Sequence, residues 1–124
     1  MATSAKYGMD IRERAFAFSV CLLKFCRQLD QKDYVIHTIS RQLLRAGTSI
    51  GANLEEAQSG ETRADFIHKN AVALKEARET RYWIRLLTAS EFAENATTKE
   101  LAEESDELMK ILAAIIVSAK GGAQ

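Results

Sequence analysis

Apolar residues recur along almost the whole chain at alternating intervals of four and three residues, the spacing of one face of an α-helix. The first series is Ile11, Ala15, Phe18, Leu22, Phe25 and Leu29, and the second is Ile36, Ile39, Leu43, Ala46, Ile50, Asn53 and Ala57. The chain contains no proline that would stop or kink a helix. The pattern therefore predicts long amphipathic helices and an all-α class.

Polar turns and capping residues divide this pattern into four helices. The segments 30–33 and 90–95 read as polar loops, and Gly60 is placed to end the second helix. Pairs that resemble N-terminal capping boxes are Asp10 with Glu13, Thr62 with Asp65, and Thr97 with Glu100. The third and fourth helices carry the series Phe66, Asn70, Ala73, Ala77, Thr80, Ile84, Leu87 and Leu101, Ser105, Leu108, Leu112, Ile115, Ala119.

Helices of about 20 residues with short loops predict an antiparallel up-down-up-down four-helix bundle. A chain of 124 residues suffices for one hydrophobic core and is too short for two. We expect a single domain at 10–120, with a flexible N-terminus at 1–9 and a flexible C-terminus at 121–124.

Two glycines stand inside the second helix, where each costs about 1 kcal/mol relative to alanine. Gly47 and Gly51 lie one turn apart, so we expect them to let the backbone approach a neighbouring helix closely. Asn53 falls on the apolar face, where an unsatisfied amide is costly. We expect it to bond Asn70 or Thr80 of the third helix. The polar network expected inside the bundle comprises Asn53, Glu56, Asn70 and Thr80.

Two segments are too apolar for a helix that buries one face. From Ala15 to Cys26 only Ser19 and Lys24 are polar, and the segment 111–117 has no polar residue. An apolar surface all round a helix indicates burial on more than one side, which in a four-helix bundle points to a subunit interface. The candidate interface residues are Phe16, Phe18, Val20, Ile111, Ile116 and Val117.

The formal net charge is zero, so no global field draws the protein to nucleic acid or to anionic lipid. The charge is unevenly spread, however: eight Lys and Arg stand against four acids through residue 49, and seven acids against three bases from residue 91. Lys75, Arg78, Tyr82 and Arg85 form one basic row on the third helix. This row suits phosphate contact with a base stacked on Tyr82. Alternatively, Glu76 and Glu79 pair with these bases, and Tyr82 and Trp83 pack at a subunit contact.

No constellation of catalytic or metal-binding residues is visible. A di-iron bundle needs two Glu-x-x-His motifs, and this chain has only Asp65 with His68, while His37 lies alone. The serines lack a nucleophile elbow, and the glycines lack the lysine of a phosphate loop. We therefore expect no enzyme, no catalytic residue, no metal and no cofactor.

The sequence shows no signal peptide and no transmembrane span. Its longest aliphatic run has seven residues, against the roughly 20 that cross a bilayer, so we expect a cytoplasmic protein without membrane contact. Cys21 and Cys26 have the spacing of neither a disulfide framework nor a zinc site. We interpret both as small buried hydrophobic residues.

The stretches RQLLRAGTSIGANLEEA (41–57) and RADFIHKNAVALKEARETRYWIRLL (63–87) carry a family resemblance. The chain resembles the bacterial four-helix-bundle proteins first noticed as open reading frames in intervening sequences of large-subunit ribosomal RNA genes. Its most specific part is Gln42, Ser49, Ile50, Asn53, Glu56, the ADF at 64–66 and the LKEA with Glu76. Mild departures are Gly51, where the family often has a small residue or proline, and Ala57, where it often has glycine.

The resemblance implies a cytoplasmic four-helix bundle that assembles into a ring-like homopentamer. It also implies a similarity of fold to the accessory variability determinant of diversity-generating retroelements, whose basic pentamer surface is associated with nucleic acid and reverse transcriptase. Two functions stay open: an oligomeric scaffold or adaptor that binds one partner protein, or an accessory protein that binds RNA or DNA through basic helix faces.

Overall fold

Four α-helices make up the part of the chain that the computed structural model describes, residues 10–59, 62–90 and 95–121. They are α2 (Ile11–Arg27), α3 (Tyr34–Gln58), α4 (Arg63–Ala89) and α5 (Ala96–Gly121). The predicted all-α class is confirmed. The flexible ends expected at 1–9 and 122–124 and the stop expected at Gly60 lie outside the described residues, whereas Gly121 is the last residue of α5.

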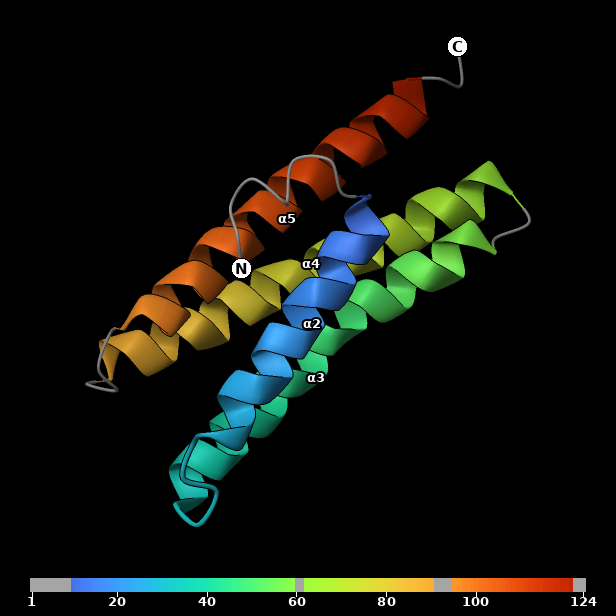
Figure 1. The fold of residues 1–124 in the computed structure, drawn as a ribbon. Helices are drawn as coiled ribbons and strands as arrows, with labels where there is room; N and C mark the ends of the chain where they lie inside the picture. The colour runs from blue at the N-terminus through green and yellow to red at the C-terminus, as the bar shows by residue number, and fades with distance from the viewer. Residues whose placement is uncertain (1–9, 60–61, 91–94, 122–124) are drawn as a thin grey trace.

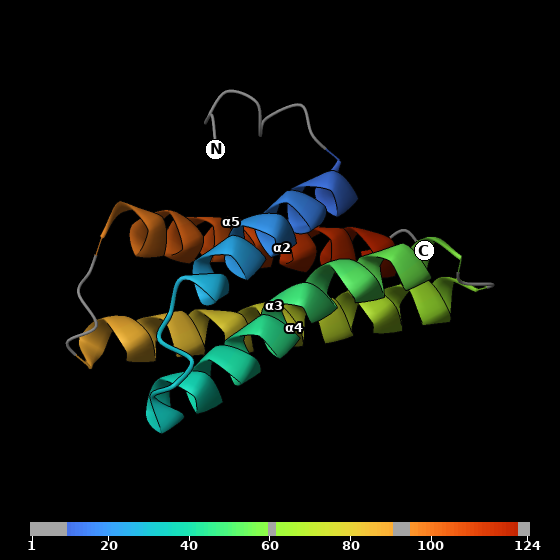
Figure 2. The same ribbon diagram turned by 60° about the horizontal axis from the view of Figure 1, so that its bottom comes forward.

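Successive helices run in opposite directions and pack beside one another, as the up-down-up-down prediction requires (Figure 1). α3 and α4 form a long hairpin, α5 packs along α4, and α2 packs on α3 and closes the bundle against α5 (Figure 2). α2 has 17 residues and is the shortest of the four, since the others have 25 to 27. The C-terminal part of α5 therefore extends past the start of α2 (Figure 1).

The core is made by the residues that the apolar spacing identifies. Fully buried side chains come from all four helices and include Phe18, Leu22, Leu43, Ile50, Ala77, Ile84, Leu108 and Leu112. Some members of the predicted series are only half-buried, namely Ile11, Ile36, Ile39, Asn53, Phe66, Ile115 and Ala119. Cys26, Leu54 and Leu74 are buried without belonging to the series. Burial of such aliphatic and aromatic side chains, each worth about 1.5 to 3 kcal/mol, holds the four helices together.

Side-chain caps fix where the helices begin. Asp10 accepts the backbone N–H of Arg12, Asp33 accepts those of Val35 and Ile36, and Thr62 accepts that of Asp65. The capping box expected at Thr97 and Glu100 is wrong. The reciprocal bonds run between the residues two positions earlier: Asn95 Oδ1 accepts the N–H of Thr98 at 2.9 Å, and Thr98 Oγ1 accepts the N–H of Asn95 at 3.0 Å. Asparagine is as good a cap as threonine, and it starts α5 at Ala96, two residues earlier than a cap at Thr97 would.

The two glycines of α3 face α2, and they differ in how closely α2 approaches. A Cβ atom placed on Gly47 would lie 2.0 Å from Cδ2 of Leu22, a fully buried side chain. One placed on Gly51 would lie 3.7 Å from Cβ of Ala15, an ordinary van der Waals contact. The expected close approach is therefore confirmed at Gly47, while Gly51 leaves room for a methyl group.

Alanine substitutions should separate these two positions. Gly51→Ala should raise the free energy of unfolding by about 0.5 to 1 kcal/mol, because alanine is the better helix former. Gly47→Ala gains the same helix propensity, but its methyl group would displace the side chain of Leu22. Such overpacking costs about 1 to 3 kcal/mol. We expect it to be less stable than the wild type. Urea denaturation of both variants measures this, and a stabilised Gly47→Ala would contradict the close contact.

Candidate functional site

The basic row on α4 consists of Lys75, Arg78, Tyr82 and Arg85. All four side chains are exposed, with Tyr82 54% exposed. At 100° per residue they point away from the buried side of α4, on which Ala73, Thr80 and Ile84 lie. The structure therefore brings the predicted nucleic-acid residues together on one outward face.

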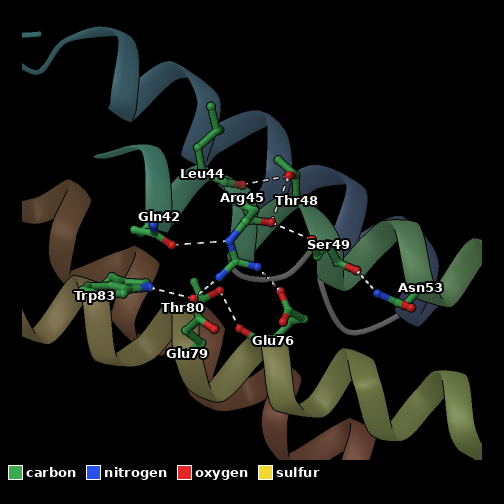
Figure 3. A network of polar contacts seen from close by, with 10 residues as sticks. All are labelled: Gln42, Leu44, Arg45, Thr48, Ser49, Asn53, Glu76, Glu79, Thr80 and Trp83. Carbon is green, nitrogen blue, oxygen red and sulfur yellow. Dashed lines mark hydrogen bonds and ion pairs between the residues drawn. The ribbon is translucent and has the colours of Figure 1, made fainter. Parts of the chain in front are cut away.

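The carboxylates between these bases point elsewhere. Arg45 of α3 reaches across to α4, where its guanidinium bonds Glu76 at 3.1 Å and also contacts Glu79 (Figure 3). Gln42 accepts from the same guanidinium at 3.4 Å. Glu76 is 9% exposed, so Arg45 supplies the positive charge that a nearly buried carboxylate requires.

Glu79 is held in its charged form by this network. The indole N–H of Trp83 donates to it at 3.0 Å and is the main reason why the pKa of Glu79 lies below its usual value. Burial opposes this effect, while Arg45 and the nearby charge of Lys75 add to it. Among the residues that the structure describes, Lys75, Arg78 and Arg85 form no salt bridge. The contacts therefore do not support the alternative in which Glu76 and Glu79 form salt bridges with the cations of the basic row.

The predicted polar network across the bundle is wrong. The Asn53 amide donates to the carbonyl of Ser49 at 2.8 Å, within its own helix, and is half-buried (Figure 3). Asn70 and Thr80 are buried, and they bond the carbonyls of Phe66 and Glu76 four residues before them.

Asn53, Asn70 and Thr80 therefore bond their own helices. A polar side chain can donate to the backbone carbonyl four residues before it and then needs no partner on a second helix. Of the four residues of the predicted network, Glu56 alone has a described bond to another helix: it is exposed and accepts from Lys69 at 2.9 Å.

The six candidate interface residues divide into three groups. Phe16, Val20 and Val117 are 69%, 37% and 71% exposed, while Ile111 and Ile116 are half-buried. Phe18 is fully buried inside the subunit, so its assignment to an interface is wrong. It belongs to the core because its place in the four-three series points it inward.

An outward apolar row on α2 extends the predicted set. Leu23 is 46% exposed and follows Phe16 and Val20 at the spacing i, i+4, i+7. We call Phe16, Val20 and Leu23 the α2 stripe. The sequence prediction missed Leu23, although the same spacing, counted from Phe16, identifies it.

A second apolar surface lies where α5 extends past α2. A shallow groove there, the α5 groove, is lined by Phe66, Ile111, Ala114, Ile115, Ser118 and Ala119. Within the same subunit α2 packs on the earlier part of α5, where Arg14 bonds Glu104 through two nitrogens at 2.7 and 3.1 Å. This buried ion pair was also missed.

The described residues contain no group of three or more His, Cys, Asp or Glu side chains placed to hold a metal ion. Cys21 and Cys26 are free thiols. Cys26 is buried as expected and Cys21 is half-buried, and burial raises the pKa of the Cys26 thiol. No helix in the described ranges is long and apolar enough to cross a membrane.

Comparison with known proteins gives two matches. Residues 8–114 match the family described as 23S rRNA-intervening sequence protein. The fold is similar to the crystal structure of a protein of unknown function, of the S23 ribosomal protein family, from Bacteroides thetaiotaomicron. The two chains share 39% sequence identity and a TM-score of 0.79, over 86% of this chain and 98% of the other. A search of curated proteins gave no match.

Proposed function

The chain belongs to the family of 23S rRNA-intervening sequence proteins, and from this premise we propose that it acts as a non-enzymatic homo-oligomeric scaffold. The assembly presents the same helix faces several times to a partner. Five subunits in a ring are the expected number, by resemblance to the family's ring-like homopentamers.

The α2 stripe is the observation that carries this proposal. It places an exposed phenylalanine, valine and leucine on one face of one helix, opposite the side that packs into the subunit. Scattered exposed apolar residues are ordinary, but a row at this spacing is typical of the seam between packed helices. Burying a phenylalanine or a leucine fully is worth about 1.5 to 3 kcal/mol each.

The test is the molar mass in solution, measured by light scattering after size exclusion. The wild type should be an oligomer at micromolar concentration, and Phe16→Asp should dissociate it into folded monomers, because an aspartate in the seam must be desolvated. Val35→Asp is the matched control: Val35 is 64% exposed on α3, outside the stripe, and its change should leave the oligomer intact. A wild-type monomer would overturn the proposal.

A second function, contact with RNA or DNA, is favoured by the free basic row. Because Glu76 and Glu79 are engaged by Arg45, the cations of Lys75, Arg78 and Arg85 are available for phosphates, and Tyr82 is available for stacking on an unpaired base. Repetition of the row around an oligomer would turn weak single contacts into avidity.

Fluorescence anisotropy with single-stranded and structured RNA tests this second function. Three phosphate contacts on a single strand give a slope of about −2 in a plot of log affinity against log salt for each engaged subunit. Arg78→Glu with Arg85→Glu should abolish binding without changing the molar mass. The control is Arg41→Glu with Arg63→Glu, which alters the charge equally at exposed sites outside the row. Absence of binding at 50 mM salt, with one stoichiometric protein partner in a pull-down, would leave the scaffold alone.

A further inference from the structure

The α2 stripe ends in opposite charges. Glu13 precedes Phe16 by three residues and Arg27 follows Leu23 by four, so both continue the spacing of the stripe. Both are exposed, and neither forms a salt bridge within the described part of the chain. From its N-terminus the outward row of α2 therefore reads acidic, apolar, basic.

The outward row of α5 also joins charged residues to an apolar part. Glu103 and Glu107 are exposed, and after Lys110 the row becomes apolar with Ala114 and Val117. The apolar part borders the α5 groove. From its N-terminus this row therefore reads acidic, basic, apolar, and the C-terminal part of α5, which holds the groove, extends past the start of α2 (Figure 1).

We infer that the α2 stripe of one subunit packs antiparallel against the α5 groove of a second copy of this chain. The inference rests on the proposed oligomeric scaffold and names its interface. A projecting row of three apolar side chains then meets an apolar hollow, and a single contact covers both the α2 stripe and the α5 groove.

Charge fixes the direction of the two helices. With Val20 beside Ala114, the antiparallel arrangement brings Leu23 to Ile111 and Arg27 to Glu107. Arg27 lies seven positions from Val20, and Glu107 lies seven positions from Ala114, which is about 10.5 Å along each helix. The parallel arrangement would instead bring Glu13 to Glu107. The antiparallel arrangement pairs Arg27 with Glu107 and brings Lys24 near Lys110 at the edge of the contact. The parallel one joins two glutamates and sets the ring of Phe16 against Lys110, so the antiparallel arrangement is favoured.

The contact joins two different faces, so every subunit donates its stripe to one neighbour and receives a stripe from another. Such a heterologous contact closes into a ring when its rotation allows. Two α2 stripes can also pair with each other about a two-fold axis, with Glu13 opposite Arg27. That pairing leaves the α5 groove uncovered, together with Val117, which is 71% exposed. The cross-linking experiment below distinguishes the two contacts.

Cysteine cross-linking tests which faces meet. Val20→Cys and Ala114→Cys are introduced singly and together in a Cys21→Ser background; Cys26 stays because it is buried. With a short bis-maleimide, the double variant should give a ladder of covalent oligomers up to the size of the assembly, while each single variant stays a monomer on a denaturing gel. Dimers from Val20→Cys alone would show the two-fold pairing and overturn the inference. An intact oligomer without a ladder would overturn it too, whereas a wild-type monomer would instead overturn the proposed function.

Charge reversal tests the direction. Arg27→Glu and Glu107→Arg should each raise the dissociation constant about tenfold or more, and the two together should return it to within a few-fold of the wild type. Such rescue must occur between subunits, because within one subunit the end of α2 lies at the start of α5: Phe25 and Gln28 line a groove with Thr97 and Leu101. No rescue, or rescue by Arg27→Glu with Glu13→Arg instead, would contradict the antiparallel α2–α5 contact.

Discussion

Phe18→Ala is expected to lower the free energy of unfolding by about 3 to 5 kcal/mol, because it removes a fully buried ring and leaves a cavity at the centre of the bundle. Phe16→Ala, two residues earlier on the opposite face of α2, should change the stability of the monomer by no more than about 0.5 kcal/mol. Both substitutions remove the same atoms, so the pair isolates the effect of burial.

The two phenylalanines should also differ in the oligomer. Guanidinium denaturation at several protein concentrations separates unfolding from dissociation, since only the latter depends on concentration. Phe16→Ala should weaken the assembly while the monomer stays folded, and Phe18→Ala should act mainly on the fold. Equal loss of monomer stability in the two variants would mean that α2 is rotated from the position described here.

Arg14→Met should cost about 3 to 5 kcal/mol, because it leaves the carboxylate of Glu104 in the core without its guanidinium partner. The side chains of Arg14 and Glu104 are 10% and 2% exposed, so water cannot replace the lost contact. The double variant Arg14→Met with Glu104→Leu removes both charges and should recover most of the loss, since apolar residues of similar volume often replace a buried ion pair without penalty.

The four variants of this pair form a double-mutant cycle that chemical denaturation can measure. We expect a coupling energy of at least about 2 kcal/mol between the two residues. The surface pair of Arg81 and Asp106 is the control, because its side chains are 34% and 43% exposed and such pairs contribute only about 0 to 1 kcal/mol. A double variant as unstable as the sum of the single ones would show that the two charges do not act as a pair.

The core could be predicted from the sequence because the four-three spacing fixes which side of each helix faces inward. The same spacing contains Phe18, and its assignment to an interface was wrong because it relied on how apolar the segment is all round rather than on the direction of each residue. Leu23 could have been predicted by counting outward from Phe16.

The polar contacts could be predicted less well. The amide of Asn53 can bond its own helix or another one, and local sequence does not distinguish these outcomes. Arg14 and Glu104 are 90 positions apart, so nothing local identifies either as a partner of the other. Arg45 likewise reaches Glu76 only because α3 and α4 pack at one particular register.

The closure of the bundle by α2 against α5 has a consequence during synthesis. At roughly 5 to 20 residues per second, the ribosome takes roughly 5 to 20 s to add the 90 residues from Arg14 to Glu104. Of the four described helices, α2 is therefore made first, and its contact with α5 is the last contact of the bundle to form. Throughout this interval Arg14 lacks the carboxylate of Glu104, and the side of α2 that packs on α5 is uncovered at the same time as the α2 stripe. Until α5 has been made, α2 is thus open to premature association on both of these sides.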